Sequence, residues 1–298
     1  MSAAPPPKPS TTLGGLRAYG WGGLGVIAAA EVLLVAGEPT VAAWFTPIVW
    51  TGYVLFIDAV TARVTGRSYL TTDRVEGLLV ALASIACWWL FELYNAPRFW
   101  RGGVEAEGLW WRYHGLEPNL LLRRVGYDWS FATIFPAMFL TAAALKATVF
   151  RRARVRPWRP PPRLLGFAVA AGAIAVFLPL VVVSTWLVPL VWIGWVLMLE
   201  PLNYRQGRPS WLADLSAGDA SRLFGLLAGG AICGVLWEFW NYGASTRWTY
   251  TVPYLGGVKI FEMPVLGYLG FPAFALEAYA MSHWLRGCLD RHVRAPVL

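Results

Sequence analysis

The sequence predicts an all-α, polytopic membrane protein in which eight transmembrane helices form two fused four-helix repeats. Three observations favour this class. Hydrophobic residues make up 57% of the 298 residues, charged residues make up only 14%, and the mean hydropathy is +0.50. A typical soluble domain carries about 25% charged residues. Apolar stretches of about 20 residues, long enough to cross a bilayer core, recur along the chain. The composition therefore excludes a soluble enzyme, a secreted disulfide scaffold and a disordered protein.

Each expected element follows from its apolar run or its composition. Residues 1–15 lack the apolar core of a signal peptide and are expected to be a disordered tail. The first four-helix repeat is predicted at 16–150 and the second at 164–287. A basic cytoplasmic linker at 151–163 separates them, and a C-terminal tail follows at 288–298. The eight spans are expected at Leu16–Gly37, Thr40–Ala62, Arg74–Tyr94, Tyr127–Phe150, Leu164–Val183, Thr185–Asn203, Arg222–Tyr242 and Pro264–Leu285.

Lysine and arginine residues set the predicted orientation of these spans. An even number of spans places both termini on one side of the membrane. Most of the basic residues lie in the terminal segments and in the loops that share that side, and the densest run is the linker at 151–163. The positive-inside rule therefore predicts an N-in/C-in, multi-pass protein of the cell inner membrane. The same arginines suit anionic lipid, and a nucleic-acid partner is not expected.

The long outer segment at 96–126 contains the aromatic run from Gly108 to Tyr113. Two interpretations of this run stay open. It lies flat among the lipid headgroups as an amphipathic segment, or it forms an ordered cap over the helix bundle.

An internal repeat is the most specific feature of the sequence. The run from Trp44 to Leu55 has the pattern WxxPxVWxGYVL, and the run from Trp186 to Leu197 repeats it as WxxPxVWxGWVL, 142 residues later. Apolar helices align by chance, but ordered matches of tryptophan and proline do not. We therefore expect a duplication in which both units have the same orientation, related by an axis along the membrane normal.

Two matched polar pairs end the third and seventh spans: Glu92 with Asn95, and Glu238 with Asn241. Polar groups inside spans are costly and are candidates for function. Each pair shares one helix face, because its members are three residues apart. Burial among aromatic rings disfavours a charged carboxyl group, and a protonated glutamate is suited to general acid catalysis. Glu238, Asn241, Glu92, Asn95 and Glu262 are the candidate catalytic residues, with the second unit favoured.

Aromatic faces around such an acid stabilise a developing cation. The candidate substrate-binding residues are Trp237, Trp240, Trp248, Tyr250, Glu277, Trp89 and Tyr94. A structural alternative stays open, because Glu and Asn on facing helices often hold a bundle together by hydrogen bonds. Three cysteines without a CxxC motif and three histidines predict no metal site, and no sequence motif for a cofactor is present.

The stretch that begins at Trp237-Glu238, continues through Trp248-Thr249-Tyr250 and ends at Glu277-Ala278 resembles the lycopene cyclase domain of small membrane-embedded carotenoid and terpenoid cyclases. Those enzymes are also built from tandem homologous units. The resemblance implies redox-neutral, acid-catalysed cyclisation of a polyene end group without a redox cofactor. The chain departs from the family where paired acids follow a helix-opening proline, because Leu266 and Gly267 occupy those positions.

We therefore expect an integral membrane enzyme that cyclises or isomerises a long apolar isoprenoid or carotenoid. The alternative is a non-catalytic subunit that binds lipid or pigment in a membrane complex. An aromatic cavity with Glu238 in its wall favours the enzyme, and a solid bundle with outward-facing tryptophans favours the subunit. The expected partners are membrane lipids or the apolar substrate, together with a second copy of the chain or another subunit of a membrane complex.

Overall fold

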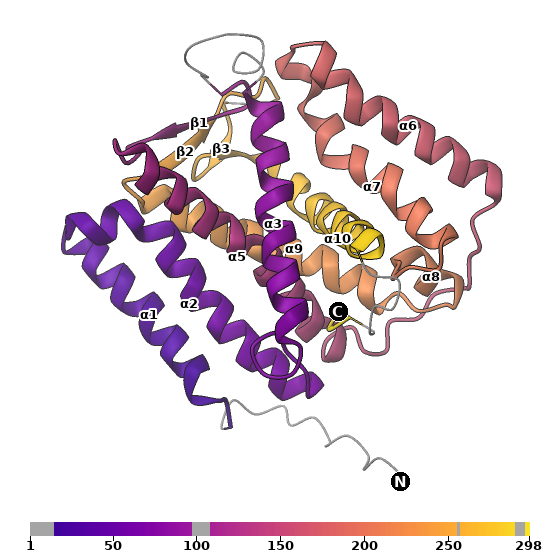
Figure 1. Ribbon diagram of the computed structural model, residues 1–298, viewed down its shortest axis with the longest axis horizontal. Helices are drawn as coiled ribbons and strands as arrows, with labels where there is room; N and C mark the ends of the chain where they lie inside the picture. The colour runs from indigo at the N-terminus through magenta and orange to yellow at the C-terminus, as the bar shows by residue number, and fades with distance from the viewer. Residues whose placement is uncertain (1–14, 97–107, 255–256, 290–295) are drawn as a thin grey trace.

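The computed structural model of the protein describes residues 15–96, 108–254, 257–289 and 296–298. Nearly all of the predicted tail at 1–15 and most of the tail at 288–298 lie outside these residues. Helices dominate the fold (Figure 1). The long helices are α1 (Ala18–Val35), α2 (Pro39–Thr65), α3 (Arg74–Asn95), α5 (Leu120–Ala147), α6 (Pro162–Val181), α7 (Val188–Arg205), α9 (Ser221–Gly243) and α10 (Gly270–Leu289).

Seven candidate membrane spans are present in the described residues, namely α1, α2, α3, α5, α6, α9 and the continuous segment Thr185–Arg205 that contains α7. Each is long and apolar enough to cross a bilayer. This agrees with the predicted class of a multi-pass helical membrane protein. The expected span at Pro264–Leu285 does not meet the same criteria, because α10 carries the polar residues Glu277, His283 and Arg286 on a buried face.

Two predicted helix starts differ from the structure by more than three residues. Helix α5 begins at Leu120, seven residues before the predicted Tyr127, because the Asn119 side chain accepts hydrogen bonds from the first backbone N–H groups of the helix. The last helix begins at Gly270 instead of Pro264. The residues before it form strand β4 (Met263–Pro264) and the 3-10 helix η2 (Val265–Leu269), so a continuous apolar run was wrongly assigned to one helix.

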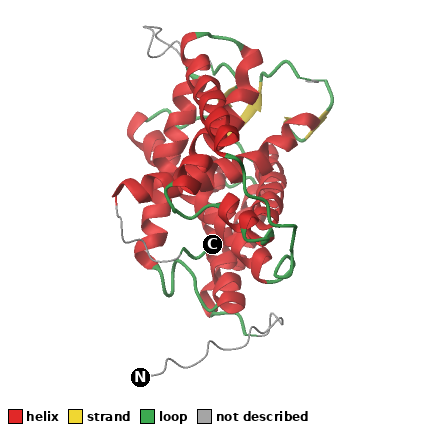
Figure 2. Ribbon diagram, turned by 90° about the vertical axis from the view of Figure 1, so that its right-hand side faces the viewer, coloured by secondary structure: helices red, strands yellow, loops and turns green. Residues whose placement is uncertain are grey.

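Short antiparallel strands make the all-α prediction incomplete. Strand β1 (Trp111–His114) pairs with β2 (Arg247–Tyr250), and β3 (Lys259–Ile260) pairs with β4. Figure 2 shows these strands near the upper end of the helical body. Trp110 and Trp111 are buried, so this part of the outer segment forms an ordered cap and does not lie flat on lipid. A short helix, α8 (Trp211–Ser216), and a 3-10 turn, η1 (Thr185–Leu187), complete the described elements.

Helices α1 and α2 lie on one side of the molecule, α6 and α7 lie on the other, and α3, α5, α9 and α10 lie between them (Figure 1). Each outer pair packs closely through glycines. A Cβ added to Gly23 would lie 2.5 Å from the carbonyl oxygen of Gly52, and one added to Gly172 would lie 2.8 Å from that of Gly194. Small residues at a crossing let two helix backbones approach, as is common between membrane helices.

A kink near the start of α2 shapes the interior. Trp44 has φ −106° and ψ 17°, outside the helical region, and Pro47 follows one turn later. Proline lacks the N–H that would bond to the preceding turn, so a helix bends at this point. Trp44 and Pro47, at this kink, both line a cavity in the interior.

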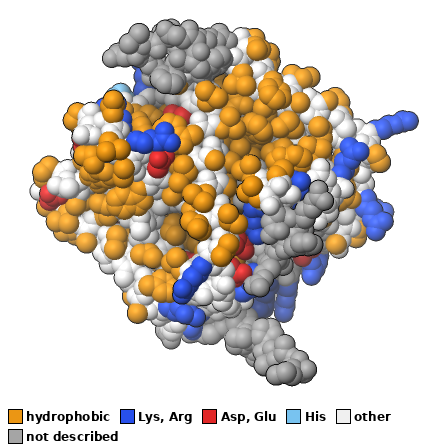
Figure 3. Space-filling view, in the orientation of Figure 1, with side chains coloured by type: hydrophobic (Ala, Val, Ile, Leu, Met, Phe, Trp, Pro, Cys, Tyr) orange, Lys and Arg blue, Asp and Glu red, His pale blue; other side chains and the backbone are white. Residues whose placement is uncertain are grey.

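Apolar side chains cover much of the face seen in Figure 3, and lysine and arginine gather mainly along its lower and right-hand edges. The predicted basic linker at 151–163 is anchored to the loop after α8. Arg154 pairs with Asp219 at 2.9 Å, and the N–H of Val155 donates to the carbonyl oxygen of Gly218. The linker therefore follows the protein surface with its arginines exposed.

Candidate aromatic cavity

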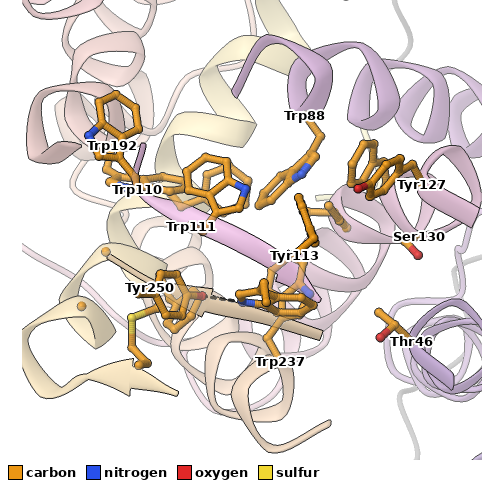
Figure 4. Close-up of a pocket in the computed structure, with 18 of the residues that line it drawn as sticks. Thr46, Trp88, Trp110, Trp111, Tyr113, Tyr127, Ser130, Trp192, Trp237 and Tyr250 are labelled. Atoms are coloured by element: carbon orange, nitrogen blue, oxygen red, sulfur yellow. Dashed lines mark hydrogen bonds between the residues drawn. The ribbon is translucent and has the colours of Figure 1, made fainter. Parts of the chain in front are cut away.

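A cavity of about 460 Å³ lies between the long helices, beneath the β1–β2 ladder. Its volume is within the usual range for ligand pockets, roughly 300–1,000 Å³. Apolar and aromatic side chains dominate its wall, and Figure 4 shows rings from several helices and both strands pointing into one space. The aromatic residues of the wall are Trp44, Trp50, Trp88, Trp110, Trp111, Tyr113, Tyr127, Phe131, Trp192, Trp237, Trp248, Tyr250, Tyr254, Phe271 and Phe274.

The β1–β2 ladder forms one wall of this cavity. Trp111 is paired with Tyr250, and Tyr113 is paired with Trp248. Side chains alternate between the two faces of a strand, so residues two apart point the same way. All four of these aromatic side chains line the cavity. The intervening Arg112 is exposed on the opposite face of the ladder.

Asn95, at the end of α3, holds β1 in place. Its Oδ1 accepts hydrogen bonds from the N–H groups of Trp110 (2.9 Å) and Trp111 (3.1 Å), and its Nδ2 donates to the carbonyl oxygen of Trp111 (3.0 Å). Asn241, at the end of α9, holds β2 in the same way. It accepts from the N–H of Trp248 (2.9 Å) and donates to the Trp248 carbonyl oxygen (2.8 Å). Both predicted asparagines therefore position strands.

Glu92 lies behind the cavity wall and accepts three hydrogen bonds on one oxygen. The donors to Oε1 are the hydroxyl of Tyr113 (2.5 Å) and the indole N–H groups of Trp88 (3.1 Å) and Trp111 (3.2 Å). Such a set of donors stabilises a carboxylate.

Glu238 also lies behind the wall, but it has fewer partners. Its side chain is fully buried, and Oε1 accepts a hydrogen bond from the Tyr250 hydroxyl at 2.7 Å. Its Oε2 is buried and accepts no hydrogen bond from the described residues. The Tyr250 oxygen in turn accepts from the indole N–H of Trp248 at 2.8 Å, the dashed contact in Figure 4. Trp248, Tyr250 and Glu238 thus form a hydrogen-bonded chain from the cavity to a buried acid.

The hydroxyls of Tyr113 and Tyr250 remain protonated over a wide pH range. Burial raises the pKa of each well above its ordinary value of about 10, and the negative charge of the adjacent glutamate raises it further. Both hydroxyls are therefore neutral, and each donates its one proton to the glutamate behind the cavity wall.

Several predicted site residues lie elsewhere. Trp237, Trp248 and Tyr250 line the cavity, whereas Trp240, Trp89 and Tyr94 do not. Each of these last three uses its polar atom in another contact. Their acceptors are Glu31 for Trp240 (2.9 Å), Asp128 for Trp89 (2.6 Å) and the carbonyl oxygen of Val176 for Tyr94 (3.0 Å).

The two remaining predicted acids are also outside the cavity wall. Glu277 is fully buried on α10 and accepts a hydrogen bond from the backbone N–H of Trp195 on α7 at 2.8 Å. Glu262 is partly buried in the turn between β3 and β4. Within the described residues, no group of three or more His, Cys, Asp or Glu side chains is placed to hold a metal ion.

Trp50 and Trp192 line the cavity but were not among the site residues predicted from the sequence. Trp50 packs against Trp237 with ring centroids 5.1 Å apart, and Trp192 stacks on Phe91 at 5.1 Å. Trp50 and Trp192 occupy the same position of the repeated WxxPxVW pattern. Recurrence of an aromatic residue in both copies was the signal that pointed to them.

Comparison with known proteins found no match. Neither a protein-family model, nor a curated protein, nor a solved structure is similar to the chain. The candidate site therefore has to be interpreted from its own geometry.

Proposed function

We propose that the protein is an integral membrane enzyme that binds a long apolar isoprenoid in the aromatic cavity and catalyses its acid-initiated, redox-neutral cyclisation or isomerisation. The hydrogen-bonded chain from Tyr250 to the buried Glu238 is the observation that carries this proposal. The resemblance of residues 237–278 to the lycopene cyclase domain supports the same class of reaction.

Tyr250 is the group that meets the substrate, and Glu238 supplies its proton. When Glu238 is protonated on Oε1, the shared hydrogen bond reverses, and the tyrosine O–H is free to point into the cavity. The tyrosine then protonates a carbon–carbon double bond and recovers a proton from Glu238. The hydrogen bond from the indole N–H of Trp248 to the Tyr250 oxygen stabilises the charge that develops there.

Protonation of the double bond leaves a carbocation on the neighbouring carbon. Ring closure forms a carbon–carbon bond by attack of a second double bond, and loss of a proton to the Tyr250–Glu238 pair restores both the acid and an alkene. The atoms of substrate and product are the same, so no oxidant or reductant is required. The indole rings of Trp88 and Trp237, stacked 6.1 Å apart in the wall, provide π-faces for the cation.

We also propose the finer architecture: two fused four-helix repeats with eight spans, oriented N-in/C-in in the cell inner membrane, with α10 as the eighth span. Matching contacts in the two halves support the duplication. Asp58 accepts a hydrogen bond from Ser68 Oγ at 2.8 Å, and Glu200 accepts one from Ser210 Oγ at 2.6 Å, at the same spacing along the chain. The two asparagine–strand contacts repeat in the same manner.

Conversion of a linear isoprenoid polyene by the purified protein in lipid nanodiscs tests the proposed reaction. The wild type is expected to give a product of unchanged mass and altered chromatographic retention. Glu238→Gln keeps the shape of the side chain and removes the proton source, so turnover should fall by about 10²-fold or more. Glu92→Gln is the matched control and should retain turnover within about tenfold of the wild type. Full turnover in the Glu238 variant would show that another group is the acid.

One observation favours the alternative function of a lipid- or pigment-binding subunit. Neither carboxyl group lines the cavity, since both lie behind tyrosines. The same experiment separates the two functions. A binding subunit would retain the polyene and release it chemically unchanged, with equal affinity in both glutamine variants.

A further inference from the structure

We propose that the aromatic cavity is a through-passage with two openings to the bilayer, one between α2 and α5 and the other between α7 and the η2–α10 segment. A ligand in such a passage is a linear apolar chain that extends beyond the protein at both ends. This inference rests on the proposed function for the identity of the chain, but it concerns where the chain enters and leaves.

The first opening lies at the kinked start of α2. Trp44 of α2 faces Gly126 of α5, where an added Cβ would lie 3.6 Å from the indole ring. Leu122, one turn earlier on α5, lines the cavity and is also 44% exposed at the surface. Glu117 and Arg123 lie at the same edge and are engaged with each other, since Arg123 Nε donates to the Glu117 carbonyl oxygen at 2.7 Å.

The second opening lies on the other side of the molecule. Ile193 of α7 and Leu269 of η2 both line the cavity, and they are 40% and 72% exposed. Gly270, the residue after Leu269, also lines the cavity, and a Cβ added there would meet no atom within 4 Å. A wall residue that is exposed to the surroundings marks a place where the cavity reaches the surface, and at this opening those residues are apolar.

The repeated sequence pattern accounts for the two openings. Pro47 and Trp50 of the first copy line one flank of the cavity, and Pro189 and Trp192 of the second copy line the other. Each proline lies three residues before its tryptophan, and the backbone hydrogen bond that it cannot make loosens the helix beside the cavity. In Figure 1, α2 and α7 lie on opposite sides of the central helices, so the openings face different regions of the bilayer.

Two lateral openings select for the shape of the ligand. A ligand with a bulky or charged group at each end would have to pull one of those groups through the aromatic centre, which buries it without partners. A linear hydrocarbon slides through, with each end solvated by lipid chains. Gly126 and Gly270 are then specificity-determining positions, because a side chain at either would narrow one opening.

Binding of two linear polyene hydrocarbons to the full-length protein in nanodiscs tests the passage. The long probe exceeds the cavity at both ends, and the short homologue fits inside it. Energy transfer from tryptophan to the polyene reports binding. Gly126→Leu and Gly270→Leu should each weaken binding of the long probe at least tenfold, or about 1.4 kcal/mol, and should leave the short probe nearly unaffected. Gly166→Leu, at an exposed glycine of α6 with open space around it, is the matched control.

The outcomes distinguish the passage from a blind pocket. If only one of the two leucine substitutions weakens binding of the long probe, the cavity has a single entrance and the proposal is wrong. The same conclusion follows if neither does. If the wild type binds neither polyene, the proposed function fails instead. The passage is then tested with lipids that carry brominated acyl chains, which quench tryptophan fluorescence on contact. The Gly126→Leu and Gly270→Leu variants should each be quenched less than the Gly166→Leu control.

Discussion

The two glutamate–asparagine sites use the same backbone contacts and differ at their carboxyl groups. Asn95 and Asn241 each hold the first tryptophan of a strand by hydrogen bonds in both directions. Glu92 then receives three donors on one oxygen, whereas Glu238 receives one donor, and its second oxygen is buried without a partner among the described residues. The same backbone arrangement thus holds two different carboxyl groups. Glu92 has one oxygen with three donors, and Glu238 has one oxygen that can still accept a hydrogen bond.

The residue four positions before each glutamate explains part of this difference. In α3 it is Trp88, whose indole N–H donates to Glu92. In α9 it is Gly234, where an added Cβ would lie 2.2 Å from the ring of Phe271, so no side chain fits. The site on α9 therefore lacks a donor at this position and has close contact between α9 and α10 instead. A buried oxygen that accepts no hydrogen bond from the described residues calls for an explanation, and Glu200 and Glu277 each carry one as well.

The largest expected effect is the difference in turnover between variants of Tyr250 and Tyr113. Tyr250→Phe removes the hydroxyl that links Glu238 to the cavity and should lower turnover of a linear polyene by about 10²-fold or more. Tyr113→Phe removes one of three donors to Glu92 and should lower turnover less than about tenfold. Product formation by both variants in nanodiscs is the measurement, with retained polyene binding as the control for folding. Equal losses in the two variants would mean that the sites are functionally equivalent.

The next largest effect is the loss of stability when Asn95 or Asn241 is replaced. Asn95→Ala leaves three buried backbone groups at the start of β1 without the asparagine as partner, and Asn241→Ala leaves two partly buried groups in β2. Each such group costs about 1–3 kcal/mol, so we expect losses of roughly 3–9 and 2–6 kcal/mol. Unfolding of the detergent-solubilised variants measures the difference. A larger loss in the Asn241 variant would contradict the proposed strand anchoring.

The smallest expected effect is on the free energy of unfolding at alkaline pH. Tyr113 and Tyr250 are expected to contribute to it equally. The pKa values of Tyr113 and Tyr250 are raised in the folded protein, so the folded state keeps protons that the unfolded state loses above about pH 10. Their contribution to stability is therefore complete below pH 10 and declines as the pH rises, by roughly 1 kcal/mol for each tyrosine near pH 11. Unfolding as a function of pH should show a shallower decline for the Tyr113→Phe/Tyr250→Phe double variant than for the wild type.

Helical spans could be predicted from the sequence because their apolar runs are long and uninterrupted. The start of the last helix could not, since the apolar residues 264–269 belong to a strand and a 3-10 helix, and an apolar run does not distinguish these from an α-helix. The β1–β2 ladder could not be predicted from the sequence either. Its pairing joins Trp111 to Tyr250 across more than a hundred residues, and single-sequence periodicity carries no information about such long-range contacts.

The candidate site was predictable in its chemistry but not in its geometry. Intramembrane carboxyl groups next to tryptophans pointed to Glu92 and Glu238. Their position behind Tyr113 and Tyr250 depends on the register of the strands, which the two asparagines determine. Glu277 was expected beside the same cavity, but the packing of α10 turns it toward the backbone of α7.

The pairing of β1 with β2 has a consequence for how the two halves depend on each other. The pair Trp111–Tyr250 and the pair Trp248–Tyr113 are the same contact with the halves exchanged, as in an isologous interface between identical subunits. A fragment that carried one half alone would expose its strand as an unpaired edge. A second copy of the fragment would complete that edge, so under the proposed duplication the fused chain corresponds to a dimer whose subunits are joined covalently.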